Sequence, residues 1–241
     1  MPMPPLLDGA GRVALVTGAA GGIGGAAVAL FQTCGARVAG FDRAAADGDL
    51  AVAGDATDEA QVEALVAQVI ETFGRLDFVV HAVGAVGSGP LAGQSAQEWR
   101  RLVDLNLTSA FLLARGVHGA LARSRGSLVL ISSTNGRNGG TATSGAAYAV
   151  AKAGVANLVR YLAREWAPAG IRVNCISPGP VATPMLDRLT ADEADTLRRS
   201  IPLGRYAGAD EVAAAAGFLC SRHAASMTGA CMNISGGLVL D

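Results

Sequence analysis

The sequence predicts an α/β protein in which seven parallel strands form one doubly wound sheet with helices on both faces. Two observations support this fold class. Seven short segments are apolar almost throughout, and they alternate with longer segments whose apolar residues recur at helical spacing. Strands that are apolar on both sides are typical of a parallel sheet buried between two layers of helices. Because no linker or shift in composition breaks the pattern, we expect a single domain over residues 1–241.

Each predicted element follows from this alternation. Strands are expected where the apolar runs lie, at residues 12–17, 37–41, 50–54, 76–81, 127–132, 171–177 and 231–235. Helices are expected after the first strand, over 96–123 and over 146–167. The clearest helix follows Asp58, which is expected to cap it, because apolar residues then share one face. Residues 182–209 lack a clear pattern, and we expect them to form an inserted mobile flap.

Charge and cysteine content limit the classes of function. The 19 Lys and Arg and the 20 Asp and Glu give a net charge of −1 without a basic block, so nucleic acid is not an expected partner. No apolar run is long enough for a membrane span, and the N-terminus lacks the features of a secretory signal. The four cysteines show no metal-ligand spacing with the three histidines. We therefore expect no metal site and a reducing, cytoplasmic location.

A glycine-rich turn follows the first strand. In TGAAGGIG (17–24), Gly18, Gly22 and Gly24 are spaced G-x-x-x-G-x-G. Glycine permits a tight turn and lets a diphosphate approach the next helix N-terminus, where free N–H groups and the helix dipole favour anions. The alternative is a turn that binds nothing, but its position between a strand and a helix favours the nucleotide.

Acidic residues follow the second and third strands. Asp42 can accept hydrogen bonds from the ribose hydroxyls of adenosine and would repel a 2′-phosphate, which favours NAD over NADP. The alternative for Asp42 is a surface turn, and the adjacent Arg43 acts against the preference because an arginine can hold a phosphate. Asp55 fits an adenine contact and a turn or cap equally well.

A serine, a tyrosine and a lysine form a third pattern. Ser133 follows the fifth strand, and Tyr148 and Lys152 stand four residues apart on the next helix, so they share one face. Lys152 is also the only lysine of the chain, because every other basic residue among the 19 is arginine. Arginine is therefore used wherever it suffices, and position 152 is the exception.

These stretches together resemble the short-chain dehydrogenase/reductase family. The matching segments are TGAAGGIG, GDATD, DLNLTS, ISS, YAVAK, NCISPGPVATPM and TGACMNISGG, in this order from about residue 10 to the end. The resemblance implies a Rossmann-type fold, a nicotinamide cofactor, a small-molecule alcohol or ketone as substrate, and usually a homotetramer.

The resemblance also implies roles for four residues. It assigns Tyr148 as general acid/base, Lys152 as its activator, Ser133 as the group that orients the substrate oxygen, and Asn106 as the holder of a relay water. Asn106 can equally be a buried side chain that bridges backbone groups. Lowering a tyrosine pKa from about 10 by three units requires about 4 kcal/mol. A compact ammonium about 4 Å away supplies energy of that order, so Lys152 is expected to lower the pKa of Tyr148.

Further contacts are implied along the rest of the chain. Pro178 and Gly179 would lie under the nicotinamide, and Val181 and Thr183 beside its carboxamide. Met185 would contact the substrate together with Ser133 and Tyr148. The full expected cofactor set is Gly18, Gly22, Ile23, Gly24, Asp42, Arg43, Asp55, Ala56, Gly84, Tyr148, Lys152, Pro178, Gly179, Val181 and Thr183.

The chain departs from the family pattern at three places. HAVG (81–84) replaces the usual NNAG, and His81 is expected to be structural. The loop from Ser133 to Tyr148 is about two residues longer than the commonest form, and Ser235 stands where the family often has Asp.

The sequence thus predicts an oxidoreductase that transfers a hydride between NAD(H) and a secondary alcohol or ketone. The alternative is an NADPH-dependent 3-oxoacyl-(acyl-carrier-protein) reductase, with Arg123 and Arg125 as carrier contacts. Asp42 counts against it, as does Ala169, where such reductases often carry a basic residue. A distant third alternative is a non-catalytic nucleotide-binding regulatory protein, which the intact Ser133, Tyr148 and Lys152 disfavour.

Overall fold

The computed structural model describes residues 7–240, and within them it confirms the predicted fold class. Its parallel sheet has the strand order β3-β2-β1-β4-β5-β6-β7. The strands are β1 (Val13–Thr17), β2 (Arg37–Asp42), β3 (Leu50–Ala53), β4 (Phe78–His81), β5 (Ser127–Ile131), β6 (Arg172–Pro178) and β7 (Cys231–Ile234). Every strand lies where an apolar run predicted one.

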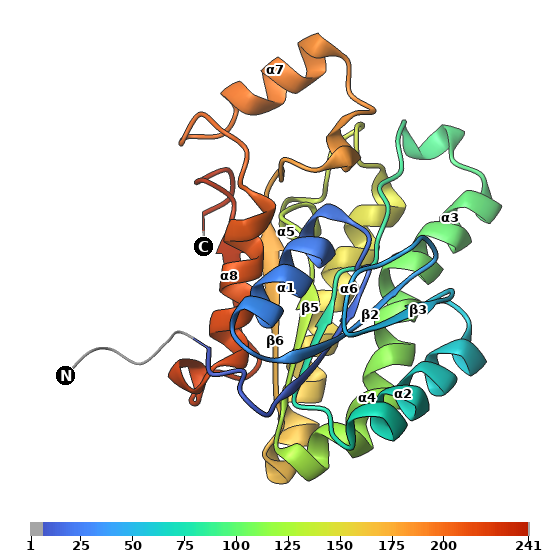
Figure 1. Ribbon diagram of the computed structural model, residues 1–241. Helices are drawn as coiled ribbons and strands as arrows, with labels where there is room; N and C mark the ends of the chain where they lie inside the picture. The colour runs from blue at the N-terminus through green and yellow to red at the C-terminus, as the bar shows by residue number, and fades with distance from the viewer. Residues whose placement is uncertain (1–6, 241) are drawn as a thin grey trace.

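Helices cover both faces of the sheet (Figure 1). On one face lie α1 (Gly22–Thr33) and α8 (Ala209–Cys220), and on the other lie α2 (Glu59–Phe73), α4 (Ser109–Ser124) and α6 (Ala146–Trp166). Strand β1 shows how one segment serves both layers. Val13 and Leu15 pack with α2, α4 and α6, whereas Ala14 and Val16 pack with α1 and α8. Side chains alternate along a strand, so a strand between two cores must be apolar at every position.

The stretch 96–123, which was predicted to be largely helical, contains two helices joined by a wider turn. Helix α3 (Ala96–Val103) meets α4 through the π-helical turn η2 (Asp104–Thr108). The Ser109 N–H donates to the Asp104 carbonyl, five residues back. Carbonyls displaced in such a turn need other donors. Side chains supply them, because Asn106 Nδ2 donates to the Leu102 carbonyl (2.9 Å) and Ser109 Oγ to the Leu105 carbonyl (2.7 Å).

The segment 182–209 is more regular than its sequence suggested. It contains the 3₁₀ turn η4 (Pro184–Leu186) and helix α7 (Ala191–Arg199), which lies at the top of the molecule in Figure 1. Thr190 and Glu193 form a capping box at the start of α7. This T-x-x-E signal was present in the sequence and predicts a helix start. Movement of the segment as a flap stays a prediction.

The remaining elements are short. They are the 3₁₀ turns η1 (Leu91–Gly93), η3 (Ala167–Ala169) and η5 (Arg222–Ala224), together with the four-residue helix α5 (Asn135–Asn138). Among residues 7–240, no helix has the length and apolar character needed to cross a membrane.

Candidate active site

A crevice lies beyond the carboxyl ends of β1, β2 and β4, where the strand order reverses direction. This is the place at which open parallel sheets bind ligands. The crevice encloses about 160 Å³. Six of the predicted cofactor residues line it, namely Gly18, Asp42, Arg43, Asp55, Ala56 and Gly84. The sequence reasoning had not included the other lining residues Gly21, Phe41, Gly54, Ala82, Val83, Ala85 and Leu105.

The glycine turn is shaped to admit a phosphate group. Gly18 has a φ of +76°, and a Cβ on it would lie 2.7 Å from the Ala82 carbonyl carbon. Helix α1 begins at Gly22, and its N-cap Gly21 has no side chain that could bond the first-turn amides. Ile23 and Gly24 belong to the same first turn. N–H groups left without a side-chain partner at a helix start suit a diphosphate, so this turn fits a dinucleotide cofactor.

Asp42 is held in place at the crevice wall. The Ala20 N–H donates to Asp42 Oδ2 (3.1 Å), and the Ala44 N–H donates to Asp42 Oδ1 (3.1 Å). One donor lies in the glycine turn after β1 and the other in the turn after β2, and together they keep the carboxylate at the end of β2. Arg43 also lines the crevice, and its side chain is exposed.

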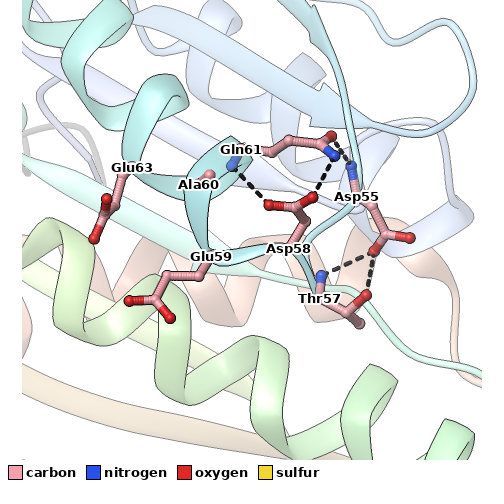
Figure 2. A pocket seen from close by; sticks show the side chains of 7 residues that line it. All are labelled: Asp55, Thr57, Asp58, Glu59, Ala60, Gln61 and Glu63. Atoms are coloured by element: carbon pink, nitrogen blue, oxygen red, sulfur yellow. Dashed lines mark hydrogen bonds between the residues drawn. The ribbon is translucent and has the colours of Figure 1, made fainter.

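Of the two roles that the sequence allowed for Asp55, an adenine contact and a turn or cap, the structure shows the turn. Its Oδ1 accepts hydrogen bonds from the Thr57 N–H (2.8 Å) and the Thr57 hydroxyl (2.7 Å), which lower the pKa of Asp55 (Figure 2). Asp58 caps α2 as predicted, since its side chain accepts from the Gln61 N–H (3.1 Å). Asp55 also lines the crevice, and its contact with adenine stays a prediction.

Ser133 and Tyr148 meet at the carboxyl end of β5. Helix α6 begins at Ala146, and its first turns direct Tyr148 inward, where 8% of the residue is exposed. Burial raises the pKa of Tyr148. A hydrogen bond with the Ser133 side chain and the positive charge of Arg188 oppose this rise. Tyr148 is therefore a protonated phenol near neutral pH, and it lies with Ser133 at the carboxyl edge of the sheet.

Lys152 lies one turn further along α6 and is buried, with 3% exposure. Its Nζ donates to the Ile131 carbonyl (2.9 Å) and lies 5.8 Å from the centre of the Tyr148 ring. Burial lowers the pKa of Lys152 to about 8. The net change in the pKa of Tyr148 is upward, opposite to the direction predicted from Lys152. The physical reason is that the loss of hydration at the buried phenol outweighs the groups that favour its anion.

Asn106 bridges backbone groups. Its Nδ2 donates to the Ala85 carbonyl (2.8 Å) and to the Leu102 carbonyl (2.9 Å), and its Oδ1 accepts from the Ala85 N–H (3.2 Å). Both side-chain donors are in use, so a relay water, which stays a prediction, would have to donate to Asn106. A Cβ on Gly84 would lie 2.6 Å from Asn106 Oδ1 and 3.1 Å from Lys152 Nζ. Asn106 and Lys152 therefore meet at Gly84, where only glycine leaves room.

The segment after β6 borders the same site. Pro178 ends the strand, and the Gly179 N–H donates to the Ile234 carbonyl (2.9 Å). Val181 is buried, and its carbonyl accepts from the Thr183 hydroxyl (3.3 Å). Met185 is 41% exposed. The contacts of these residues with cofactor or substrate stay predictions.

Gly22, at the start of α1, lies close to Thr183 in the segment after β6. A substitution at Gly22 can therefore test whether this contact shapes the cofactor site. A Cβ on Gly22 would overlap the Thr183 Cγ2. We expect Gly22→Ala to weaken NADH binding about tenfold, because overpacking costs about 1–3 kcal/mol and displaces the segment after β6. Adding Thr183→Ser, which removes Cγ2 and keeps the hydroxyl, should recover part of the affinity. A fluorescence titration with NADH measures both effects.

Gly25→Ala is the matched control for this test. A Cβ on Gly25 would meet only the Ala19 carbonyl oxygen, at an ordinary distance of 3.4 Å. Equal NADH affinity of Gly22→Ala and Gly25→Ala would show that the contact with Thr183 does not shape the cofactor site.

Two features of the site were missed by sequence reasoning. Arg188 lies in an irregular stretch, and no pattern distinguishes it from other exposed arginines, although its charge acts on Tyr148. Thr17 and Ser109, which bond His81, lie 64 and 28 residues from it in the chain. In the described part of the chain, no cluster of His, Cys, Asp and Glu side chains could hold a metal ion.

Known proteins resemble this chain along almost all of its length. The family described as enoyl-(acyl carrier protein) reductase matches residues 18–239. The chain is 38% identical to the cis-4-hydroxycyclohexanecarboxylate dehydrogenase of Sinomonas cyclohexanicum over 94% of this chain and 96% of that protein. It is 35% identical to the 3-oxoacyl-(acyl-carrier-protein) reductase of Escherichia coli over 95% of this chain and 98% of that protein. The solved aldohexose dehydrogenase of Thermoplasma acidophilum superposes with a TM-score of 0.87 and 28% identity, covering 97% of this chain and 94% of that chain.

Proposed function

The chain belongs to the short-chain dehydrogenase/reductase family, and from this premise we propose that it uses NAD to interconvert a secondary alcohol and its ketone. It is an oxidoreductase that acts on CH–OH groups with a nicotinamide cofactor. The observation that carries the proposal is that buried Lys152 lies between Tyr148 and the nucleotide crevice: its Nζ is 5.8 Å from the centre of the Tyr148 ring and 3.1 Å from where a Cβ on the crevice residue Gly84 would lie. The substrate named for the Sinomonas relative, cis-4-hydroxycyclohexanecarboxylate, is itself a secondary alcohol, which supports the substrate class.

In the proposed mechanism, Tyr148 moves the proton. The phenol donates its proton to the carbonyl oxygen when a ketone is reduced, and the phenolate accepts the hydroxyl proton when an alcohol is oxidised. Ser133 holds the same oxygen by a hydrogen bond. A nicotinamide cofactor, when bound, supplies the hydride donor or acceptor and, in its oxidised form, a positive charge. The ordinary pKa of a tyrosine, about 10, already makes the phenol its resting form near neutral pH, and burial raises the pKa of Tyr148 further, so the residue rests in the form that donates a proton in ketone reduction.

Lys152 and Asn106 support this proton transfer. The ammonium group of Lys152 is fixed by the Ile131 carbonyl, so it presents its other N–H donors at a constant place. Asn106 is fixed by Ala85 and Leu102 and lies against the same Gly84. We propose that Lys152 binds the cofactor ribose and that Asn106 accepts a hydrogen bond from a relay water.

The proposed preference for NAD rests on Asp42, and replacing it is a direct test. We expect Asp42→Ala to shift the ratio of NADH to NADPH affinity toward NADPH by about tenfold or more, because a fixed carboxylate no longer repels the 2′-phosphate. Paired titrations with the two cofactors measure the ratio. Asp47→Ala, at an exposed position of the following loop, is the control and should leave the ratio unchanged. An unchanged ratio in Asp42→Ala would remove the argument for NAD.

A second candidate is an NADPH-dependent 3-oxoacyl-(acyl-carrier-protein) reductase. Two observations favour it: the Escherichia coli relative has this activity in its name, and Arg43 lines the crevice where a 2′-phosphate would lie. The expected carrier contacts lie far from the site within one chain. Arg123 and Arg125 stand at the end of α4, just before β5 begins at Ser127, whereas the Ser133–Tyr148 pair lies beyond the other end of β5. The two arginines thus lie at the opposite edge of the sheet from the site of the same chain, and their contact with a carrier stays a prediction.

The first experiment compares NADH and NADPH binding and then measures turnover of a panel of secondary alcohols with the preferred cofactor. Tighter NADH binding with turnover of simple secondary alcohols supports the proposed function. Tighter NADPH binding, with activity confined to 3-oxoacyl thioesters, would favour the second candidate.

Members of this family are generally oligomeric, and we propose a homotetramer. The exposed apolar side chains of Phe111 on α4 and of Val150 and Tyr161 on α6 support association through these two helices.

A further inference from the structure

His81 is a buried side chain that bonds through both nitrogens of its ring. It ends β4 and is 2% exposed. Its Nδ1 lies 2.7 Å from Thr17 Oγ1 at the end of β1, and its Nε2 lies 3.1 Å from Ser109 Oγ at the start of α4. One imidazole thus connects two neighbouring strands of the sheet with the helix that follows the π-helical turn η2.

The hydrogen-bond partners determine where the ring carries its proton. The Ser109 hydroxyl has one proton and donates it to the Leu105 carbonyl at 2.7 Å. Ser109 can therefore only accept from His81, which places the ring proton on Nε2. Nδ1 is then an acceptor, and the Thr17 hydroxyl donates to it. Burial and the charge of Lys152 lower the pKa of His81 to about 3, so the ring stays neutral and does not relay protons near neutral pH.

The chain of hydrogen bonds leads from His81 to the catalytic cluster. Ser109 bonds the Leu105 carbonyl within η2, and the same turn carries Asn106. Asn106 in turn contacts the space at Gly84 that Lys152 Nζ also borders. Any shift of the Ser109 hydroxyl would therefore move the turn that sets the position of Asn106.

We propose that His81 is a positioning residue whose Nε2–H, acting through Ser109, holds η2 so that Asn106 lies against Gly84 and Lys152. The inference rests on the proposed function, because it assumes that Asn106 and Lys152 serve the reaction. It goes beyond a general packing role, since it assigns the effect to one nitrogen of the ring. The bond from Nδ1 to Thr17 joins β4 to β1 and is not expected to affect turnover directly.

Two substitutions separate the nitrogens. In His81→Gln, the side-chain amide nitrogen reaches about as far as Nε2, so the bond to Ser109 is kept. In His81→Asn, the shorter amide reaches only the position of Nδ1, so the bond to Thr17 is kept and Ser109 loses its donor. The family's second asparagine is replaced by Ala82 in this chain, so His81→Asn does not restore the family's NNAG pattern.

The test measures kcat and KM of both variants with the best alcohol of the panel, together with their melting temperatures. We expect His81→Gln to keep kcat within about threefold of the wild type. His81→Asn should lower kcat by about tenfold to a hundredfold with little change in KM, as expected for a small misplacement of a group near the reacting atoms. Equal kcat in the two variants, or a loss confined to KM and melting temperature, would overturn the proposal.

Ser109→Ala is a second, independent arm that remains informative if His81→Asn does not fold. It removes the bond to His81 together with the bond to the Leu105 carbonyl, so it should lower kcat at least as far as His81→Asn. The double variant should be no slower than Ser109→Ala alone, because the bond between His81 and Ser109 is already absent there. Multiplying losses would contradict the proposal. Failure of the proposed function is recognised separately, because a Tyr148→Phe enzyme would then remain active whatever the His81 variants do.

Discussion

Tyr148→Phe is expected to lower kcat by about 10³-fold or more without disturbing the fold or the binding of the cofactor. The substitution removes only the hydroxyl, and positioned acid–base groups contribute about 10²–10⁴-fold to turnover. The phenyl ring still fills the buried space at the start of α6, where Tyr148 is 8% exposed. The measurements are steady-state kinetics in both directions and an NADH titration, which should give an unchanged dissociation constant.

Tyr161→Phe is the matched control for this prediction. Tyr161 lies on the same helix and is 63% exposed, so the same chemical change is made away from the site. Its kcat should equal that of the wild type. Normal turnover of Tyr148→Phe would exclude Tyr148 as the acid/base and would refute the proposed mechanism.

Lys152→Met is expected to abolish most turnover and, at neutral pH, to raise the free energy of unfolding by about 1–2 kcal/mol. The pKa of Lys152 falls from 10.5 to about 8 on burial. At about 1.4 kcal/mol per pKa unit, keeping this ammonium charged inside the protein costs roughly 3 kcal/mol. Methionine has a similar length and no charge, so that cost disappears. The Ile131 carbonyl loses its donor, which offsets about 1 kcal/mol of the gain.

The pH dependence of stability distinguishes this cause from better packing. Between pH 8 and 10.5 the unfolded chain binds more protons at Lys152 than the folded protein does, so the stability of the wild type rises with pH across this window. The advantage of Lys152→Met should therefore be full below pH 8 and shrink as the pH approaches 10.5. Urea unfolding at a series of pH values measures it. A constant difference across the window would show that the charge is not the cause.

The strands and the glycine turn could be predicted from the sequence because their signals are local. A strand buried on both faces must be apolar along its length, and the Gly18 turn needs a positive φ that few other residues adopt. The start of α2 could be predicted from Asp58 because an aspartate side chain caps a helix by accepting a hydrogen bond from an N–H of the first turn, which is what Asp58 does here. For the same reason, Ser133 could be assigned to the carboxyl edge of the sheet, whereas the assignment of Tyr148 to the site came from the resemblance to the family.

The rest depends on contacts between distant parts of the chain. No local sequence signal distinguishes the π-helical turn η2, because the residues around Asn106 keep the apolar spacing of an ordinary α-helix. The role of His81 follows only once Thr17 and Ser109 lie on either side of it. The direction of the pKa shift of Tyr148 depends on how deeply the ring is buried, which no spacing of residues reports. The capping box of Thr190 is different, since its signal was local and was overlooked.

The burial of Lys152 has a consequence for chemical modification. This ε-amino group is the only lysine amine of the chain, and with 3% exposure it is buried between α6, which carries it, and the end of β5. Acylating reagents, crosslinkers and conjugating enzymes that require lysine therefore find none on the surface formed by residues 7–240. Covalent labelling of Lys152 therefore requires α6 to move away from the end of β5 and expose the amine. The rate at which Lys152 Nζ is acylated would therefore report how often the proposed active site opens to solvent.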